Sequence, residues 1–356
     1  MDCELVVTAL TAMDVLVTPY SPNCCSANQY KLKCQNNRVT ELYWDDMGLV
    51  GNLNLDGLNL LSKVSLAGNT NLTSLKALCS KTSLTWLDVS GISAPLDCGL
   101  SNLQSLYAKD TSLNSVSSMC SSSGLKVLDI SNNNVSSLSC PNWNLKYLYA
   151  SNNSFTTDSS ICGSSAISRL DLSDNKIDKL GCGFKSVIAL NLQNNLISNS
   201  SSLCAMNALQ VLDVSGNKLT SFSSCLPNLQ ELSLAENKIT NITDLLCSSS
   251  KLSFLDVEDN LLTSLPHCES EQNVEIIDEQ NSITNRYTRI PKASTTTVKY
   301  YSSMLFYGTS SMPATPVTLV IAPKKTKNII GNENGSTTVS SSIIQFLVAF
   351  ISVNLL

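Results

Sequence analysis

The sequence predicts an α/β repeat solenoid, in which short parallel strands stack into one curved β-sheet. The main observation is a 42-residue spacing: similar fragments begin at Leu61, Leu103, Leu145, Val187 and Leu229. A second, shorter copy lies within each interval, and these copies begin at Leu84, Leu125, Ile167, Leu209 and Leu252. A period of about 20 residues is typical of solenoids, because no single repeat can bury its apolar face alone.

Each unit fits the pattern LxxLxLxxNxL, with eleven copies of which the first begins at Val39. The apolar alternation predicts a short strand with one buried face, so stacked copies should form a parallel sheet on the inner side of an arc. Repeats this short leave room outside the sheet only for turns, extended segments or single helical turns, so we expect low helix content.

An asparagine follows the strand in most copies, where its side-chain amide can satisfy backbone groups of the turn. The asparagines are Asn69, Asn133, Asn153, Asn175, Asn195, Asn217, Asn237 and Asn260. Ile92 and Thr111 replace it in two neighbouring copies, and we interpret them as tolerated defects of a long array. This motif identifies the chain as a member of the leucine-rich repeat family over residues 39–281.

One cysteine also recurs in every repeat from the second onward, on the outer return of the coil. The ten are Cys79, Cys98, Cys120, Cys140, Cys162, Cys182, Cys204, Cys225, Cys247 and Cys268. They form either five disulfides between adjacent coils or a column of buried thiols acting as small hydrophobic residues. We favour the buried thiols, because a repeat core does not need covalent links.

Residues 23–53 resemble the N-terminal cap of plant-type extracellular leucine-rich repeat proteins, although the usual tryptophan between the cysteines is absent. A Cys-Cys pair precedes a third cysteine, an Arg-Val-Thr-x-Leu strand and a Leu-x-Gly step. The resemblance implies disulfides Cys3–Cys24 and Cys25–Cys34, with a cap helix in the apolar segment 5–13. The alternative for that segment is a signal peptide.

The sequence divides into four predicted regions: a cap at 1–38, repeats and a C-terminal half-repeat at 39–281, a Ser/Thr-rich stalk at 282–334, and a tail at 335–356. Small residues, a polar spacer and an apolar terminus indicate a signal for a GPI anchor attached at Asn334, in preference to a tail-anchored helix. Further Asn-X-Ser/Thr glycosylation sites are predicted at Asn71, Asn134, Asn152, Asn199 and Asn241.

The predicted ligand site is an aromatic patch on the inner face of four adjacent coils. Its residues are Trp86, Tyr107, Lys109, Lys126, Tyr147 and Tyr149. Large exposed aromatic side chains tend to mark interfaces. Five inward aspartates, at Asp88, Asp129, Asp171, Asp213 and Asp256, are attributed to the repeat consensus instead of a ligand.

Composition narrows the functional classes further. The net charge of -5 has no basic cluster for nucleic acid, and no C-x-x-C motif accompanies the single histidine, His267. We therefore expect no metal, cofactor or catalytic residues, and a monomer. The preferred hypothesis is a non-enzymatic surface recognition or adhesion protein, GPI-anchored to the plasma membrane or secreted, which binds protein or glycan. The alternative is an intracellular leucine-rich repeat scaffold or enzyme regulator.

Overall fold

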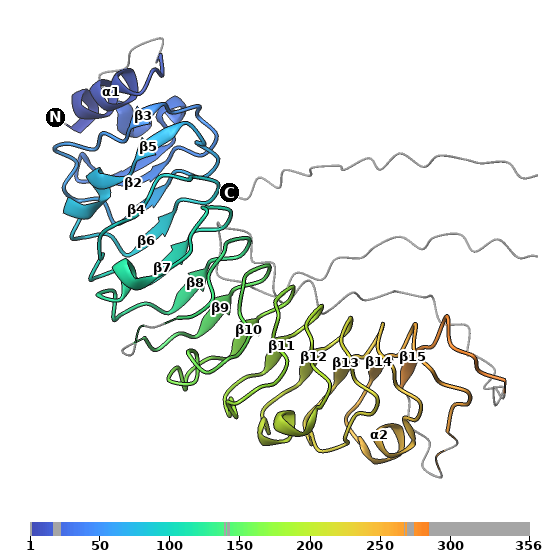
Figure 1. The fold of residues 1–356 in the computed structure, drawn as a ribbon. Helices are drawn as coiled ribbons and strands as arrows, with labels where there is room; N and C mark the ends of the chain where they lie inside the picture. Colours follow the sequence, from blue (N-terminus) through green and yellow to red (C-terminus); the bar gives the residue numbers. More distant parts are fainter. Residues whose placement is uncertain are drawn as a thin grey trace, which may run out of the picture. The chain divides into compact units, whose positions relative to one another are not determined.

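The computed structural model describes residues 2–16, 23–138, 140, 143–266, 268 and 274–284, all within one compact unit. The predicted tail with Asn334, all but the first residues of the predicted stalk, and His267 lie outside the described residues. The described part is a stack of coils, each of which contributes a strand to one long sheet (Figure 1). None of the helices in these ranges is long and apolar enough to span a membrane.

A 13-stranded sheet runs through the whole stack. Its strands are, in spatial order, β1 (Leu32–Gln35), β2 (Arg38–Tyr43), β4 (Lys63–Ser65), β6 (Trp86–Asp88), β7 (Ser105–Tyr107), β8 (Val127–Asp129), β9 (Tyr147–Tyr149), β10 (Arg169–Asp171), β11 (Ala189–Asn191), β12 (Val211–Asp213), β13 (Glu231–Ser233), β14 (Phe254–Asp256) and β15 (Glu275–Ile277). β1 pairs antiparallel with β2, and every later neighbour is parallel. The predicted curved parallel sheet is thus confirmed.

The remaining elements are short and lie outside this sheet. They are β3 (Gly51–Asn52) and β5 (Leu72–Ser74), the 3-10 turns η1 (Cys24–Ser26), η2 (Asn28–Tyr30), η3 (Lys76–Ser80), η4 (Ser117–Met119) and η5 (Ser201–Ala205), and the helices α1 (Asp2–Ala12) and α2 (Thr243–Ser248). The strands follow the inner side of the curve, whereas α2 lies on the outer side (Figure 1). Helix content is low, as the short repeats predict.

The core lies behind the sheet, because the middle residue of each strand points into the stack. Leu106, Leu128 and Leu148 are direct neighbours in the strand register, and each is fully buried. Successive coils therefore add one leucine at a time to a single continuous apolar cluster that extends from α1 to the last coils. Such a core makes each coil depend on its neighbours for burial.

The asparagine ladder links each coil to the one before it. Asn153 donates from Nδ2 to Ile130 O at 2.9 Å on the preceding coil, and accepts at Oδ1 from Val135 N at 2.9 Å. Asn281 makes equivalent bonds after β15, so the ladder continues into the last half-repeat. At the two exceptions, Thr111 Oγ1 donates to Ala108 O at 2.8 Å, and Ile92 is fully buried. Thr111 thus keeps one of the ladder's bonds, while Ile92 replaces the amide with apolar packing.

The prediction of reduced, buried thiols in the repeats was wrong. The ten cysteines form five disulfides: Cys79–Cys98, Cys120–Cys140, Cys162–Cys182, Cys204–Cys225 and Cys247–Cys268. Stacking brings the paired Cα atoms to between 5.0 and 5.6 Å, within the range that a disulfide requires. Cys79 and Cys162 are exposed, so the column is not a buried one. Each disulfide joins the two coils of one 42-residue unit.

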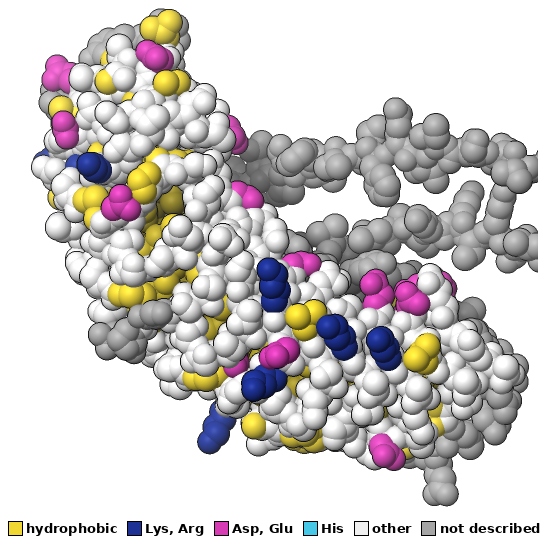
Figure 2. All heavy atoms as spheres, viewed as in Figure 1, with side chains coloured by type: hydrophobic (Ala, Val, Ile, Leu, Met, Phe, Trp, Pro, Cys, Tyr) yellow, Lys and Arg dark blue, Asp and Glu magenta, His cyan; other side chains and the backbone are white. Residues whose placement is uncertain are grey.

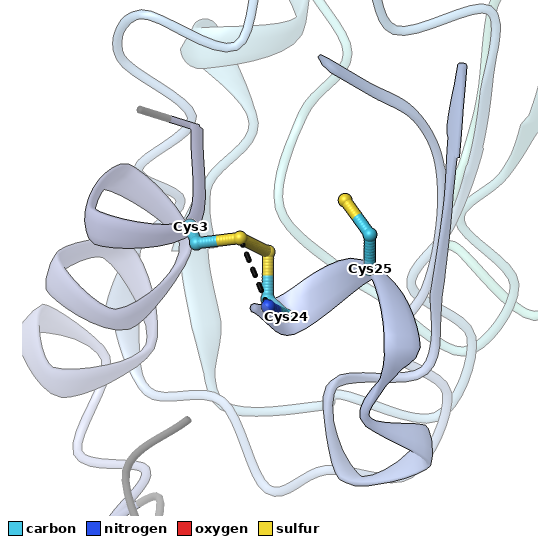
Figure 3. A group of neighbouring side chains, drawn as sticks. All are labelled: Cys3, Cys24 and Cys25. Carbon is cyan, nitrogen blue, oxygen red and sulfur yellow. Dashed lines mark hydrogen bonds between the residues drawn. A yellow bond between two sulfur atoms is a disulfide. The ribbon is translucent and has the colours of Figure 1, made fainter. Parts of the chain in front are cut away.

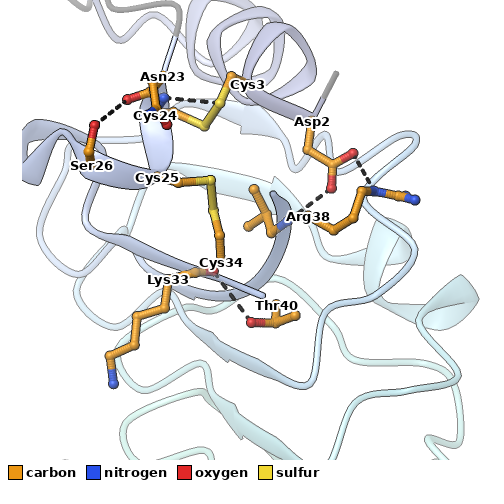
Figure 4. Close-up of a disulfide and its surroundings, with 11 residues drawn as sticks. Asp2, Cys3, Asn23, Cys24, Cys25, Ser26, Lys33, Cys34, Arg38 and Thr40 are labelled. Atoms are coloured by element: carbon orange, nitrogen blue, oxygen red, sulfur yellow. Dashed lines mark hydrogen bonds and ion pairs between the residues drawn. A yellow bond between two sulfur atoms is a disulfide. The ribbon is translucent and has the colours of Figure 1, made fainter. Parts of the chain in front are cut away.

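At the N-terminus, α1 closes the first coil and is held there by covalent and polar links. The structure contains the disulfides Cys3–Cys24 (Figure 3) and Cys25–Cys34 (Figure 4), which are the pairs that the cap resemblance implies. Asp2 also accepts hydrogen bonds from Arg38 Nε at 2.8 Å and from the Val39 backbone at 2.9 Å (Figure 4). Buried apolar residues of α1 thereby cover the open end of the core.

Candidate recognition surface

Two rows of side chains face the open side of the sheet, because the first and third residues of each strand point away from the buried middle one. The first-position row contains, in register, Glu41, Lys63, Trp86, Ser105, Val127, Tyr147, Arg169 and Ala189. The third-position row contains Tyr43, Ser65, Asp88, Tyr107, Asp129, Tyr149, Asp171 and Asn191. All four predicted aromatic residues therefore lie on this inner face.

Trp86 and Tyr107 form a direct ring contact between β6 and β7. Their ring centroids are 5.5 Å apart, and the ring planes are tilted by 46°. Both residues remain half-buried, so each ring keeps surface for a ligand. Two rings in a tilted contact of this kind hold each other in place, so little side-chain entropy is lost when a partner binds them.

A second aromatic group lies two strands further along and contains an arginine that the sequence analysis missed. The guanidinium of Arg169 lies over the Tyr147 ring at 5.6 Å and is close enough to Tyr149 for its positive charge to act on the pKa of that hydroxyl. Burial raises the pKa of Tyr149 to about 12, so its hydroxyl stays protonated at neutral pH. Arg169 occupies the same strand position as Trp86 and Tyr147. This position alone would have predicted from the sequence that Arg169 faces the inner side of the sheet.

The predicted lysines lie at the margin of the aromatic surface. Lys126 is exposed and precedes β8, while Lys109 is half-buried and follows β7. Lys109 lies close enough to Asp129 to lower the pKa of that carboxyl slightly, against a larger increase caused by burial. The structure therefore places the six predicted residues on one surface, but only Trp86 and Tyr107 are in mutual ring contact.

The inward aspartates have a structural role in the turns that follow the strands. One carboxylate oxygen of Asp129 accepts from Ser131 N at 2.9 Å, and Asp171 accepts from Ser173 N at 3.0 Å and Ser173 Oγ at 2.7 Å. Burial raises the pKa of both carboxyls, that of Asp171 to about 6. These bonds agree with the attribution of the aspartates to the repeat pattern. The bonds do not fully offset the cost of burying a negative charge, and the pKa values are therefore raised.

Charged and apolar side chains are distributed unevenly along the stack. On the face shown in Figure 2, apolar side chains gather over the coils of β4 to β8, whereas lysines and arginines are more frequent over the coils of β10 to β13. Near the C-terminal end, burial and neighbouring acids raise the pKa of Asp256.

Two groups with sulfur atoms close together do not have the chemistry of a metal site. In one group, Cys3, Cys24 and Cys25 are neighbours (Figure 3), and in the other Asp158 lies beside Cys162 and Cys182. All of these sulfur atoms belong to disulfides, whereas a metal requires thiolates. Asp158 uses its two carboxylate oxygens to accept from Gly181 N at 2.7 Å and Cys182 N at 2.9 Å.

The comparisons with known proteins agree with this architecture. The leucine rich repeat family matches residues 208–229, which contain β12. The fold is a leucine-rich repeat solenoid. An internalin from Listeria monocytogenes has a similar structure, with a TM-score of 0.55, 18% identity, and coverage of 80% of this chain and 95% of that one. No curated protein matches the sequence.

Two further solved structures share the leucine-rich repeat fold. The ectodomain of the plant membrane receptor kinase GASSHO1/SCHENGEN3 from Arabidopsis thaliana, solved in complex with CASPARIAN STRIP INTEGRITY FACTOR 2, has a TM-score of 0.61 at 21% identity. The match covers 75% of this chain, which spans only 36% of that ectodomain. The leucine-rich repeat domain of APL1B has a TM-score of 0.53 at 17% identity, covering 71% of this chain and 76% of its own.

Proposed function

We propose that this protein is a non-enzymatic recognition protein that binds a protein or glycan ligand on the inner face of its solenoid. The observation that carries the proposal is the aromatic surface formed by Trp86, Tyr107, Tyr147 and Tyr149, which come from three of the four consecutive strands β6 to β9. Tyrosine and tryptophan supply much of the contact energy at interfaces, because they bury a large area and lose little conformational entropy. A rigid sheet that presents them needs no rearrangement to bind.

We place the protein outside the cytosol, at the cell surface through a GPI anchor at Asn334 or in secreted form. Seven disulfides join the fourteen cysteines, and disulfides persist in oxidising compartments. The solved plant ectodomain that shares this fold also carries a bound ligand. The alternative, an intracellular scaffold or enzyme regulator, conflicts with this number of disulfides.

The positions of the glycosylation sites support the inner face as the binding surface. Asn71, Asn134, Asn152, Asn199 and Asn241 are all exposed, and none belongs to the two inward rows. Glycans at these positions would cover the flanks and the outer return of the coils. The aromatic surface would stay accessible to a partner.

The binding proposal is tested by replacing Trp86 and Tyr149 together with alanine in the full chain. Intact cells are the source of partners, and quantitative mass spectrometry compares what the wild type and the variant capture. Phe254→Ala is the matched control, because Phe254 is a half-buried aromatic residue in the first-position row of the distant strand β14. We expect the double variant to lose its partner and Phe254→Ala to keep it. Equal capture by all three proteins would move the site away from the aromatic surface.

The compartment is tested separately on cells that express the full gene product. Release by phosphatidylinositol-specific phospholipase and a mass shift after removal of N-linked glycans are the expected results. Cell-associated protein that resists the phospholipase, lacks glycans and is alkylated at its cysteines without reduction would favour the intracellular alternative.

A further inference from the structure

Tyrosine and tryptophan rings occur at three places along the described inner face, and at two of them the chain supplies its own cation. At the N-terminal end, Lys33 Nζ lies 5.4 Å from the centroid of the Tyr43 ring and 3.1 Å from a carboxylate oxygen of Glu41. Further along the stack, Arg169 lies 5.6 Å from the Tyr147 centroid. These contacts show that the rings of this face are positioned to hold positive charge.

The third place, the Trp86–Tyr107 pair, has a different arrangement. Among the residues that the structure describes, no lysine or arginine lies over either of these rings. Lys63 is the direct register neighbour of Trp86, but its ammonium group is 3.7 Å from Glu41, on the side away from Tyr107. The ring pair therefore presents an aromatic surface without a cation from the chain.

Carboxylates border this ring pair on both sides. Asp88 and Asp129 are the register neighbours of Tyr107 in the third-position row, and neither forms an ion pair within the described part of the chain. Burial raises the pKa of both carboxyls, and at Asp129 this increase exceeds the lowering caused by the nearby Lys109. Asp129 is the more accessible of the two, since Asp88 is only 1% exposed.

We propose that Trp86, Tyr107 and Asp129 form a binding site for the guanidinium of an arginine side chain on a protein partner. A guanidinium stacks flat on an aromatic ring while its N–H groups donate to a carboxylate, so both features of the site are used at once. The inference rests on the proposed function of the inner face and names the chemistry of its ligand. A neutral sugar would also stack on these rings, but it would not neutralise the carboxylates.

The fluorescence of Trp86 itself reports on ligand binding at this site. The other two tryptophans, Trp44 and Trp143, are buried in the core, so a ligand that reaches the inner face changes the emission of Trp86 alone. The probe is a short glycine peptide that contains one arginine, titrated into the full-length protein. Its control is the same peptide with citrulline, which has nearly the shape of arginine but no charge.

The matched variants are Asp129→Asn and Asp213→Asn. Asp213 lies in the same row on β12, between Asn191 and Ser233 instead of tyrosines, and its carboxylate makes the same turn bond, to Ser215 N at 3.0 Å. Both exchanges keep an oxygen for the turn and remove one charge. Only Asp129→Asn changes the proposed site.

We expect the arginine peptide to give a saturable change in Trp86 emission and to bind at least about five-fold more tightly than the citrulline peptide. Asp129→Asn should abolish this preference, and Asp213→Asn should retain it. Equal binding of the two peptides, an equal effect of the two variants, or no saturable response would each overturn the arginine site. The proposed function would survive any of these results, because it depends on the separate capture experiment with Trp86 and Tyr149.

Discussion

Removing one inter-coil disulfide should lower the stability of the solenoid by an amount set by the length of the loop that the disulfide closes. Cys204 and Cys225 are 21 residues apart, with Cα atoms at 5.1 Å. In the chain-entropy description, closing a loop of this length restricts the unfolded state by about 3 kcal/mol. We therefore expect Cys204→Ser to reduce the free energy of unfolding by about 3 kcal/mol and the melting temperature by on the order of 10 °C.

The assay combines thermal unfolding, followed by circular dichroism, with alkylation and mass spectrometry. Cys204→Ser and the double variant Cys204→Ser/Cys225→Ser should lose the same stability, because both remove one covalent bond. The wild type, alkylated without reduction, should carry no label on its repeat cysteines. Labelled repeat cysteines in the wild type, or melting temperatures that the variants leave unchanged, would refute the account of linked double coils.

Two further predictions concern buried polar groups. Asn195 Oδ1 accepts a hydrogen bond from Ile177 N at 2.9 Å, so Asn195→Ala leaves that buried N–H without its partner and should lower the free energy of unfolding in urea by about 3 kcal/mol. Asn195→Thr should recover part of this loss, because Thr111 keeps one ladder bond at the equivalent position. Equal losses in the two variants would contradict the ladder. Burial raises the pKa of Asp171 from 3.8 to about 6, so the native state binds this proton more tightly and stability falls as pH rises between these values. Relative to Asp213→Asn, Asp171→Asn should therefore stabilise the protein by about 3 kcal/mol near neutral pH and by much less at a pH near 3.8. A difference between the two variants that does not depend on pH would contradict the assignment.

The repeating part of the fold could be predicted because its signal is repeated eleven times. An alternation of leucines specifies which side of each strand is buried, and the following asparagine specifies the turn. Even the exception at Thr111 keeps one of the ladder's hydrogen bonds, to Ala108 O. The half-repeat around β15 was less visible: its apolar positions were expected at Val274 and Ile277, whereas Ile276 pairs with the buried Leu255 and Asn281 preserves the ladder.

The cysteines show where reasoning from residue type fails. The sequence placed them correctly in a column on the outer return, but their state was inferred from the needs of a core and not from the distance between coils. Ten thiols in a line, each within reach only of its neighbours, have one complete pairing, which begins with Cys79–Cys98 and ends with Cys247–Cys268. That argument depends on Cα separations near 5 Å, which made the disulfides geometrically possible in the sequence analysis but did not decide their state.

At the recognition surface, the strand pattern was sufficient for the aromatic residues and insufficient for their partners. Trp86 and Tyr149 could be placed because residues beside a buried leucine must face the open side. Arg169 satisfies the same rule, but an isolated arginine on a strand carries no compositional signal until the Tyr147 ring is found beneath it. Lys126 was assigned by proximity in sequence, and its position before β8 leaves it at the margin.

The disulfides, the ladder and the aromatic surface are connected by the requirement for a rigid inner face. In a solenoid each coil contacts only its neighbours, so the curvature is determined by the links between successive coils. Here the asparagine amides link coils close to the sheet, at Asn153 for example, and the disulfides link them on the opposite return, at Cys120–Cys140 for example.

Links on both sides of a coil restrict its tilt, and a sheet that cannot tilt presents Trp86 and Tyr107 in one arrangement before any partner arrives. Preorganisation of this kind reduces the entropic cost of binding. Loss of the Cys120–Cys140 disulfide, behind β8, should therefore weaken ligand binding more than loss of Cys247–Cys268 at the far end, even where the two losses of stability are equal.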